Sequence, residues 1–194
     1  MSREQLTRGF LWVSVLGWGI GLGAKLFDLI VVARAWGAAP PASLALMPYG
    51  PHYPLNPGDF FKPLSALMVV GILGALISGW KTPLQYRVWL WVPVITFVII
   101  WIFTPTVFWP MIRELYGAGS GKIVRSDAEL ILLVRRWMIW DWLRVAVIAT
   151  GFAEVRDSEC AQRSPRGKGT LIARTNETRS CLCLRFAVSF SARC

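Results

Sequence analysis

Histidine and cysteine are nearly missing from the main part of this chain. His52 is the single histidine, and the four cysteines, Cys160, Cys181, Cys183 and Cys194, all lie after residue 153. Haem and zinc or other transition-metal sites are usually built from clusters of these two residue types. The sequence therefore argues against a His-rich metal or haem site, and we predict no metal ion and no cofactor.

Charged residues are also scarce, at 16% of the chain, whereas hydrophobic residues make up 55% and the mean hydropathy is +0.48. The apolar residues lie in runs, three of which are long enough to cross about 30 Å of hydrocarbon, and the fourth is marginal. We predict an all-α, four-helix transmembrane bundle over residues 1–153, in a multi-pass protein of a lipid bilayer, the cell membrane in a bacterium. The four runs are Phe10–Val32, Lys62–Trp80, Arg87–Ile112 and Trp137–Ala153.

Two function classes find no support in the sequence. The net charge is +10, but no basic stripe with interleaved aromatic residues is present, so we expect no nucleic acid partner. Transporters are often built from internal repeats, and no repeat is evident across the four apolar runs. The basic residues fit better as charges that flank membrane spans.

A long connection, Arg34–Phe61, follows the first apolar run and holds six of the twelve prolines. Proline at this density prevents a regular helix and favours an extended loop. The loop also carries His52 and Tyr53. Long loops inside compact domains are often functional, so we expect this one to cover a site.

Four charged residues lie where membrane helices are normally apolar, in two pairs of opposite sign. Lys25 and Asp28 lie late in the first run, and Asp141 and Arg144 lie early in a helix predicted over 127–153. In a bundle of four spans these two ends lie on the same side of the membrane. Because a charge inside a bilayer needs a partner, we predict cross-pairing of Lys25 with Asp141 and of Asp28 with Arg144.

Two interpretations of this cluster stay open. It is either a neutral structural clasp, or a polar pocket under the proline-rich loop that moves protons or binds a ligand. Under the second interpretation the candidate catalytic residues are Lys25, Asp28, His52 and Arg144. The candidate substrate-binding residues are Trp18, Tyr53, Trp101 and Asp141.

Small residues predict which helices touch. Ser14, Gly17 and Gly21 share a face with Lys25, and a second small stripe, Gly71–Gly79, follows in the next run. Small residues let membrane helices approach closely, so we predict a seam between these two faces. Other tryptophans fall near the predicted interfaces, as expected for aromatic belts. They are Trp36, Trp109 and Trp137 on one side and Trp80, Trp89 and Trp91 on the other.

The stretch Arg135–Arg144, RRWMIWDWLR, resembles the last-helix pattern of the DUF1772, or anthrone oxygenase-like, membrane family. That pattern has a tryptophan, a polar residue that is often asparagine, and an arginine three residues further on. Here Asp141 takes the polar position and Arg144 takes the arginine position. The segment Asn56–Phe60, NPGDF, and the small residues of the first run fit as well, so that the resemblance covers about residues 9–152.

The resemblance implies an integral membrane protein of four helices, some of whose relatives oxidise polyketide anthrones to anthraquinones. A base would remove an acidic C–H of such a hydrophobic small molecule, and the carbanion would react directly with oxygen. Asp28 or His52 would be the base, and Lys25 or Arg144 would stabilise the oxyanion. The alternative is a non-enzymatic small membrane protein, either a structural partner or a lipid or quinone binder.

The last segment, 154–194, differs from the rest in composition. It has no sustained periodicity, and all eleven tryptophans lie before it. We interpret it as a disordered or aberrant C-terminal tail. It is either an ordinary basic tail or the product of a shift in reading frame near Phe152.

The frameshift hypothesis predicts an interrupted reading frame around the codon for Phe152. Resequencing the gene across this codon tests it directly. An intact frame there would leave the ordinary basic tail as the explanation.

Overall fold

The computed structural model describes residues 2–49, 53 and 55–163, and no β-strand occurs among them. Four long helical rods form an antiparallel bundle, which confirms the predicted all-α fold. The first rod is α1 (Arg3–Phe27), the π-helical turn η1 (Asp28–Val32) and α2 (Ala33–Trp36), and a 3-10 turn, η2 (Ala42–Leu46), follows it. The other rods are α3 (Pro57–Ser78); α4 (Leu84–Phe103), the π-helical turn η3 (Thr104–Phe108) and α5 (Trp109–Gly119); and α6 (Asp127–Arg163).

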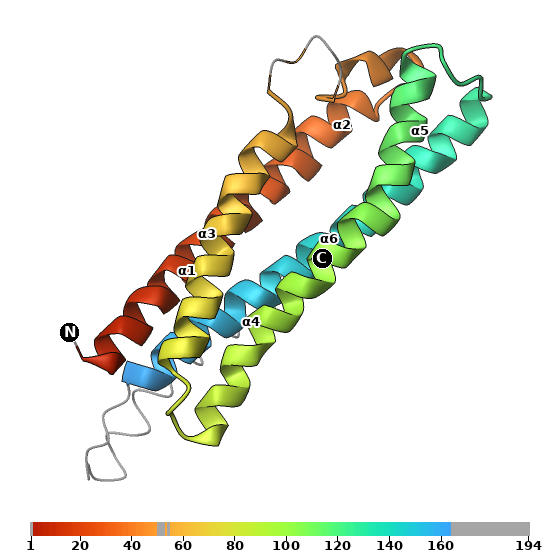
Figure 1. Cartoon of the computed structure of the whole chain (residues 1–194). Helices are drawn as coiled ribbons and strands as arrows, with labels where there is room; N and C mark the ends of the chain where they lie inside the picture. Colours follow the sequence, from red (N-terminus) through yellow and green to blue (C-terminus); the bar gives the residue numbers. More distant parts are fainter. Residues whose placement is uncertain (1, 50–52, 54, 164–194) are drawn as a thin grey trace.

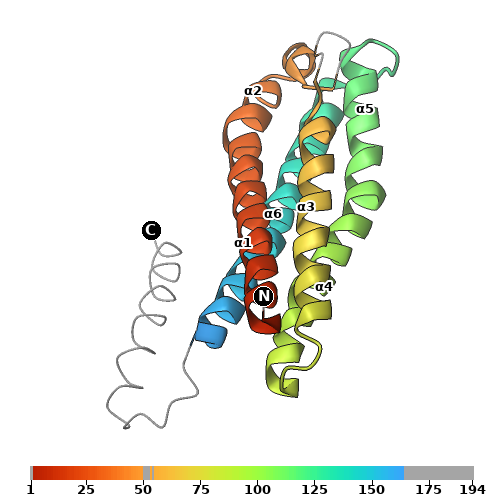
Figure 2. The same ribbon diagram turned by 60° about the vertical axis from the view of Figure 1, so that its left-hand side comes forward.

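The rods lie side by side, with α1 next to α3 and α4 crossing α6 (Figure 1). The loop after α2 and the turn between α5 and α6 lie at one end, which we call the loop end (Figures 1 and 2). The N-terminus and the turn between α3 and α4 lie at the opposite end (Figure 1). The described part of the proline-rich loop includes η2, which contacts α2 and α5 at this end. That the loop covers a site stays a prediction.

Two predicted helix ends were wrong. The first rod continues to Trp36, and α3 begins at Pro57 rather than at Lys62. Asn56 caps α3. Its Oδ1 accepts a hydrogen bond from the backbone N–H of Gly58 at 2.8 Å, and the backbone N–H of Asn56 donates to Asp59 Oδ2 at 2.9 Å. Proline is favoured in the first turn of a helix, where its missing N–H does no harm. One proline assigned to the loop thus starts a helix.

The start of α6 is confirmed, but its end was wrong. Glu129 N–H donates to Ser126 Oγ at 3.4 Å and Ser126 N–H donates to Glu129 Oε2 at 3.0 Å, so that the helix starts with a capping box. The helix then continues past residue 153 to Arg163. Residues 164–194 of the proposed tail lie outside the described residues, so its origin stays a prediction.

Three helical stretches are long and apolar enough to cross a membrane: Arg3–Trp36, Pro57–Ser78 and Arg87–Gly119. Many large apolar side chains of these stretches face outward, including Phe27, Ile77 and Trp101. The chain is thus an integral membrane protein. The helix α6 is not among the three, since charged residues interrupt its apolar run, and four membrane passes stay a prediction.

The seam between α1 and α3 has the predicted small residues at its contacts. A Cβ placed on Gly71 would lie 2.7 Å from the backbone nitrogen of Ser14 and 3.0 Å from its Cα. One on Gly17 would lie 2.8 Å from Cγ of Met68. The two backbones approach this closely only because these positions have no side chain.

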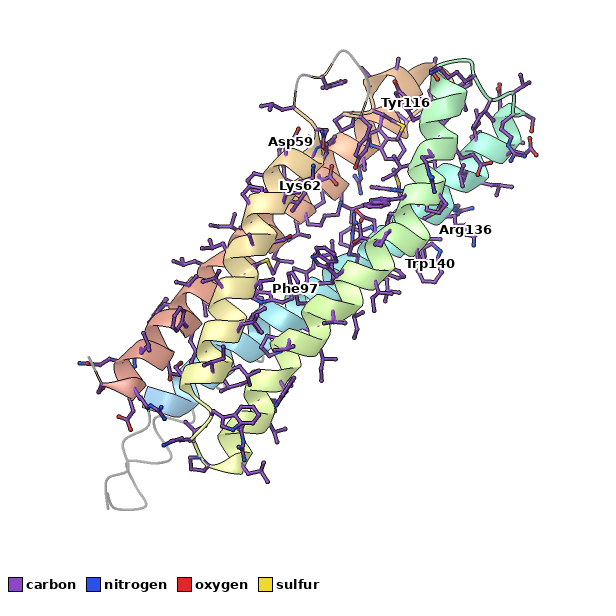
Figure 3. The ribbon with its side chains drawn as sticks, in the orientation of Figure 1. Asp59, Lys62, Phe97, Tyr116, Arg136 and Trp140 are labelled. Atoms are coloured by element: carbon purple, nitrogen blue, oxygen red, sulfur yellow. The ribbon has the colours of Figure 1, made fainter. Side chains whose placement is uncertain are left out.

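The interior is divided into two cores along the bundle. The lower core joins α1, α3, α4 and α6 around Trp18, with Phe97 against it between the helices (Figure 3). The upper core, at the loop end, includes Trp36, Phe108 and Trp137. Both Trp36 and Trp137 are 1% exposed, so their assignment to an aromatic belt at the interface was wrong. Inside the bundle the two indole rings pack edge to face, with their centroids 4.9 Å apart.

The seam predicts the effect of adding one methyl group. Gly71→Ala pushes a Cβ against the backbone of Ser14, so we expect a loss of about 1–3 kcal/mol in the free energy of unfolding. Gly23→Ala on α1 is the matched control, because a Cβ there meets nothing within 4 Å. Thermal unfolding of both variants in detergent measures the difference. Equal midpoints for the two variants would contradict the seam.

Candidate functional site

The four charged residues predicted to meet do lie together, between α1, η1 and α6. Lys25 Nζ donates to Asp28 Oδ2 and lies 3.1 Å from Asp141 Oδ2, while Arg144 Nη2 donates to Asp141 Oδ1. The predicted pair Lys25–Asp141 is confirmed. The predicted pair Asp28–Arg144 is wrong, since no ion pair among the described residues joins these two side chains. Arg144 pairs instead with Asp141, one turn earlier on its own helix.

The cluster is deeply buried, but not equally for its four members. The side chain of Asp141 is 0% exposed and that of Lys25 is 5% exposed, whereas Asp28 and Arg144 keep 14% and 12%. Two positive and two negative charges make the cluster neutral, which reduces the free-energy penalty of burial. Asp141 holds both cations, and Asp28 and Arg144 are the members that can still be reached from outside.

Aromatic rings surround the cations. The guanidinium carbon of Arg144 lies 3.9 Å from the centroid of the Phe108 ring, and Lys25 Nζ lies 5.5 Å from that of Trp137. The rings of Phe108 and Trp137 meet edge to face at 5.9 Å. A cation over a ring face is stabilised by the ring quadrupole, more strongly where water is excluded. The site therefore combines fixed charge with flat apolar walls.

Two π-helical turns among the described residues contribute to the site. The turn η1 begins at Asp28, and η3 ends at Phe108. A π turn inserts an extra residue into a helix and re-aims its side chains, and such turns are frequent at functional sites. In η3 the cause is local, since Pro105 has no N–H to donate within the helix. Neither π turn was predicted from the sequence.

Three buried polar atoms of the site make no hydrogen bond within the described residues: Trp137 Nε1, Arg144 Nε and Asp141 Oδ2. The last of these is in ion-pair range of Lys25, but the geometry is not that of a hydrogen bond. Most buried polar atoms in proteins are hydrogen-bonded. The Nε–H of Arg144 is thus a buried donor without an acceptor among the described residues.

Tyr49 belongs to this site, and sequence reasoning did not select it. Its ring is partly buried against the upper core. Burial raises the pKa of its hydroxyl, the negative charges of Asp28 and Asp141 raise it further, and Arg144 lowers it. Burial therefore favours the protonated form of this hydroxyl. Nothing in the local sequence pattern marks it, because only the folding of the loop brings it near these charges.

The other candidate residues lie elsewhere. Trp18 is fully buried in the lower core, with Nε1 unpaired among the described residues, and Trp101 is 64% exposed on α4. Tyr53 is half-exposed, and its hydroxyl donates to the carbonyl of Leu46 at 3.1 Å. His52 lies outside the described residues. The structure thus brings together Lys25, Asp28, Asp141 and Arg144, while substrate contacts by Trp18, Tyr53 and Trp101 stay predictions.

The pattern of helices and charges agrees with a comparison against protein families. The family model for anthrone oxygenase matches residues 55–153, a little more than half of the chain. The chain belongs to the anthrone oxygenase family. The matched range holds Asp141 and Arg144, whereas the first rod with Lys25 and Asp28 lies before it, and its fit to the family stays a prediction. No curated protein and no solved structure matches the chain at a significant level.

The charged side chains at the site are two carboxylates and two cations. Within 2–49, 53 and 55–163, no group of three or more His, Cys, Asp or Glu side chains is placed to hold a metal ion. The charges at the site are instead supplied by the chain itself, two cations against two carboxylates.

We expect substitution of Asp141 to lower the free energy of unfolding more than substitution of any other member of the cluster. Asp141→Asn leaves Lys25 and Arg144 with one carboxylate between them, so we expect a loss of about 3–5 kcal/mol in the free energy of unfolding. Adding Lys25→Met removes the surplus charge and should recover part of that loss. Chemical unfolding in detergent micelles measures all three proteins.

The matched control is Glu114→Gln, which removes one partner of an exposed ion pair with Arg125 at 2.5 Å. Exposed pairs contribute about 0–1 kcal/mol. A loss for Asp141→Asn no larger than that of the control would show that the buried cluster does not hold the helices together.

Proposed function

We propose that the chain is a membrane-embedded oxygenase that uses O2 to oxidise an anthrone, or a closely related aromatic polyketide, to a quinone. Membership of the anthrone oxygenase family supports this proposal. The observation that carries it is the buried guanidinium of Arg144, whose Nε has no hydrogen-bond partner among the described residues while its Nη2 donates to Asp141. Such a donor is suited to a substrate oxygen that gains negative charge.

The reaction needs a base and a stabilised anion. An anthrone carries a methylene carbon between two aromatic rings, opposite a carbonyl group. Removal of one methylene proton leaves a carbanion whose electron pair spreads onto the carbonyl oxygen as an enolate. The carbanion carbon then bonds to O2 and gives a peroxide, which loses water to form the second carbonyl. One oxygen atom enters the quinone, and the other leaves in the water.

The geometry supports a role for each charged residue. Asp28 is the more exposed of the two carboxylates, so it is the better placed base. Arg144 donates to the enolate oxygen through Nε, and Lys25 adds positive charge nearby. Asp141 touches both cations and fixes their positions. His52 stays the alternative base.

Aromatic side chains beside the charge cluster support this substrate class. Phe103 meets Phe108 edge to face with centroids 5.5 Å apart, and Trp140 meets Phe103 at the same distance. Aromatic side chains of this kind pack well against a flat polycyclic molecule. A hydrophobic substrate of this class dissolves in the bilayer, where the chain resides.

Asp28→Asn tests the proposal, since it removes the basic oxygen but keeps the size of the side chain and an acceptor for Lys25. We expect a loss of about 100-fold or more in the rate of anthrone oxidation. The rate is measured as quinone absorbance with purified protein in detergent, per amount of folded protein. Glu114→Gln, at an exposed pair away from the site, is the control and should keep the wild-type rate. Unchanged turnover of folded Asp28→Asn would remove Asp28 from the mechanism.

A second candidate function is a non-enzymatic membrane protein that binds a lipid or quinone or acts as a structural partner. The neutrality of the cluster favours it, because all four charged side chains have an ionic partner. It requires that the wild-type protein does not oxidise anthrones and that Asp28→Asn alters stability alone. Purification in mild detergent followed by mass analysis of bound small molecules identifies a lipid or quinone directly.

A further inference from the structure

Trp137 of α6 packs directly against the charge cluster. Lys25 Nζ lies 5.5 Å from the centroid of its ring. The centroid of Phe108 lies 5.9 Å from that of Trp137 and 3.9 Å from the guanidinium carbon of Arg144. Trp137, Asp141 and Arg144 also share one face of α6, because they follow one another at steps of four and three residues. The indole, the Phe108 ring and the two cations therefore form one buried group.

The indole N–H of Trp137 is a buried donor without an acceptor among the described residues. The residue is 1% exposed, and its Nε1 makes no hydrogen bond there. An indole N–H can donate but cannot accept, so only an acceptor atom satisfies it. A buried donor left unpaired reduces stability, and a phenylalanine at this position would avoid that penalty. A bound molecule with an acceptor oxygen removes the penalty.

The cluster holds a second unpaired donor, Nε of Arg144. The two donors belong to positions 137 and 144 of α6, and seven residues rise about 10 Å along an α-helix. This separation suits two oxygens at different points of one ligand better than a single oxygen. An anthrone has one carbonyl oxygen, and the quinone formed from it has a second oxygen on the opposite side of the same ring. The two donors therefore match the two oxygens of the quinone.

We propose that Trp137 is a further ligand-binding residue of the site, and that its indole N–H donates to the oxygen that the reaction adds. The role rests on the proposed oxygenase function, which supplies the identity of the ligand. Arg144 Nε binds the carbonyl oxygen that the anthrone already carries. Trp137 binds the oxygen attached to the opposite carbon, and the site thereby holds the quinone at both of its carbonyl groups.

The test is Trp137→Phe, which removes the N–H and keeps an aromatic ring in the core. Binding of anthraquinone and of anthrone is measured under nitrogen, so that no oxidation occurs, with the protein in lipid nanodiscs and empty nanodiscs as the blank. We expect the affinity for anthraquinone to fall by about 10-fold, as for the loss of one hydrogen bond. The affinity for anthrone, which lacks the second oxygen, should stay within about 3-fold of wild type.

The matched control is Trp36→Phe, the same exchange in the same core at a residue that is also 1% exposed. It should keep both affinities within about 3-fold of wild type. If Trp137→Phe does not fold, 3-benzothienylalanine introduced at position 137 gives the same test. In that residue sulfur replaces the N–H in a ring of nearly the same shape.

The outcomes separate this proposal from the proposed function. An equal loss of affinity for anthraquinone and anthrone overturns the assignment of Trp137 to the added oxygen, and so does an unchanged affinity for anthraquinone. Oxidation of anthrone in air by the wild-type protein is measured separately. Its absence overturns the oxygenase function, whereas a loss confined to anthraquinone would still identify Trp137 as a contact of a quinone.

Discussion

The buried carboxylate of Asp141 joins the two helices on which the site is built. One of its oxygens lies 3.1 Å from Nζ of Lys25 on α1, and the other accepts from Arg144 on its own helix. An unpaired charge in the interior of a membrane protein is strongly unfavourable. The relative depth of α1 and α6 is thus set by charge pairing, and the aromatic rings and the loop pack around the result.

The two cores differ in what they contain. The lower core is closely packed around the α1–α3 seam, where Gly71 meets the backbone of Ser14. The upper core contains the charges, both π-helical turns and the rings of Trp137 and Phe108. Buried polar atoms without partners among the described residues occur in both cores, Trp18 Nε1 in the lower and Arg144 Nε in the upper. Groups of this kind reduce stability, and proteins retain them mainly at functional sites.

A neutral cluster and a reactive site are compatible in the same place. Pairing holds the cations in fixed positions, and fixed charges in a region with little water stabilise a developing anion without reorganising. The buried Nε of Arg144 and the partly exposed Asp28 are the two features that go beyond what a structural clasp requires. Arg136 of the same helix is exposed at the surface (Figure 3), whereas the side chain of Arg144 is only 12% exposed.

The sequence by itself determined the four-helix membrane fold, the Gly71 seam and the meeting of Lys25 with Asp141, because hydropathy and helical spacing are local properties. It also predicted the start of α6 at Asp127. Only the tertiary structure decided that Arg144 pairs within its own helix and that Trp36 and Trp137 are interior residues. The same holds for Tyr49. These features depend on how side chains from distant segments share a small buried volume, which periodicity along one helix does not encode.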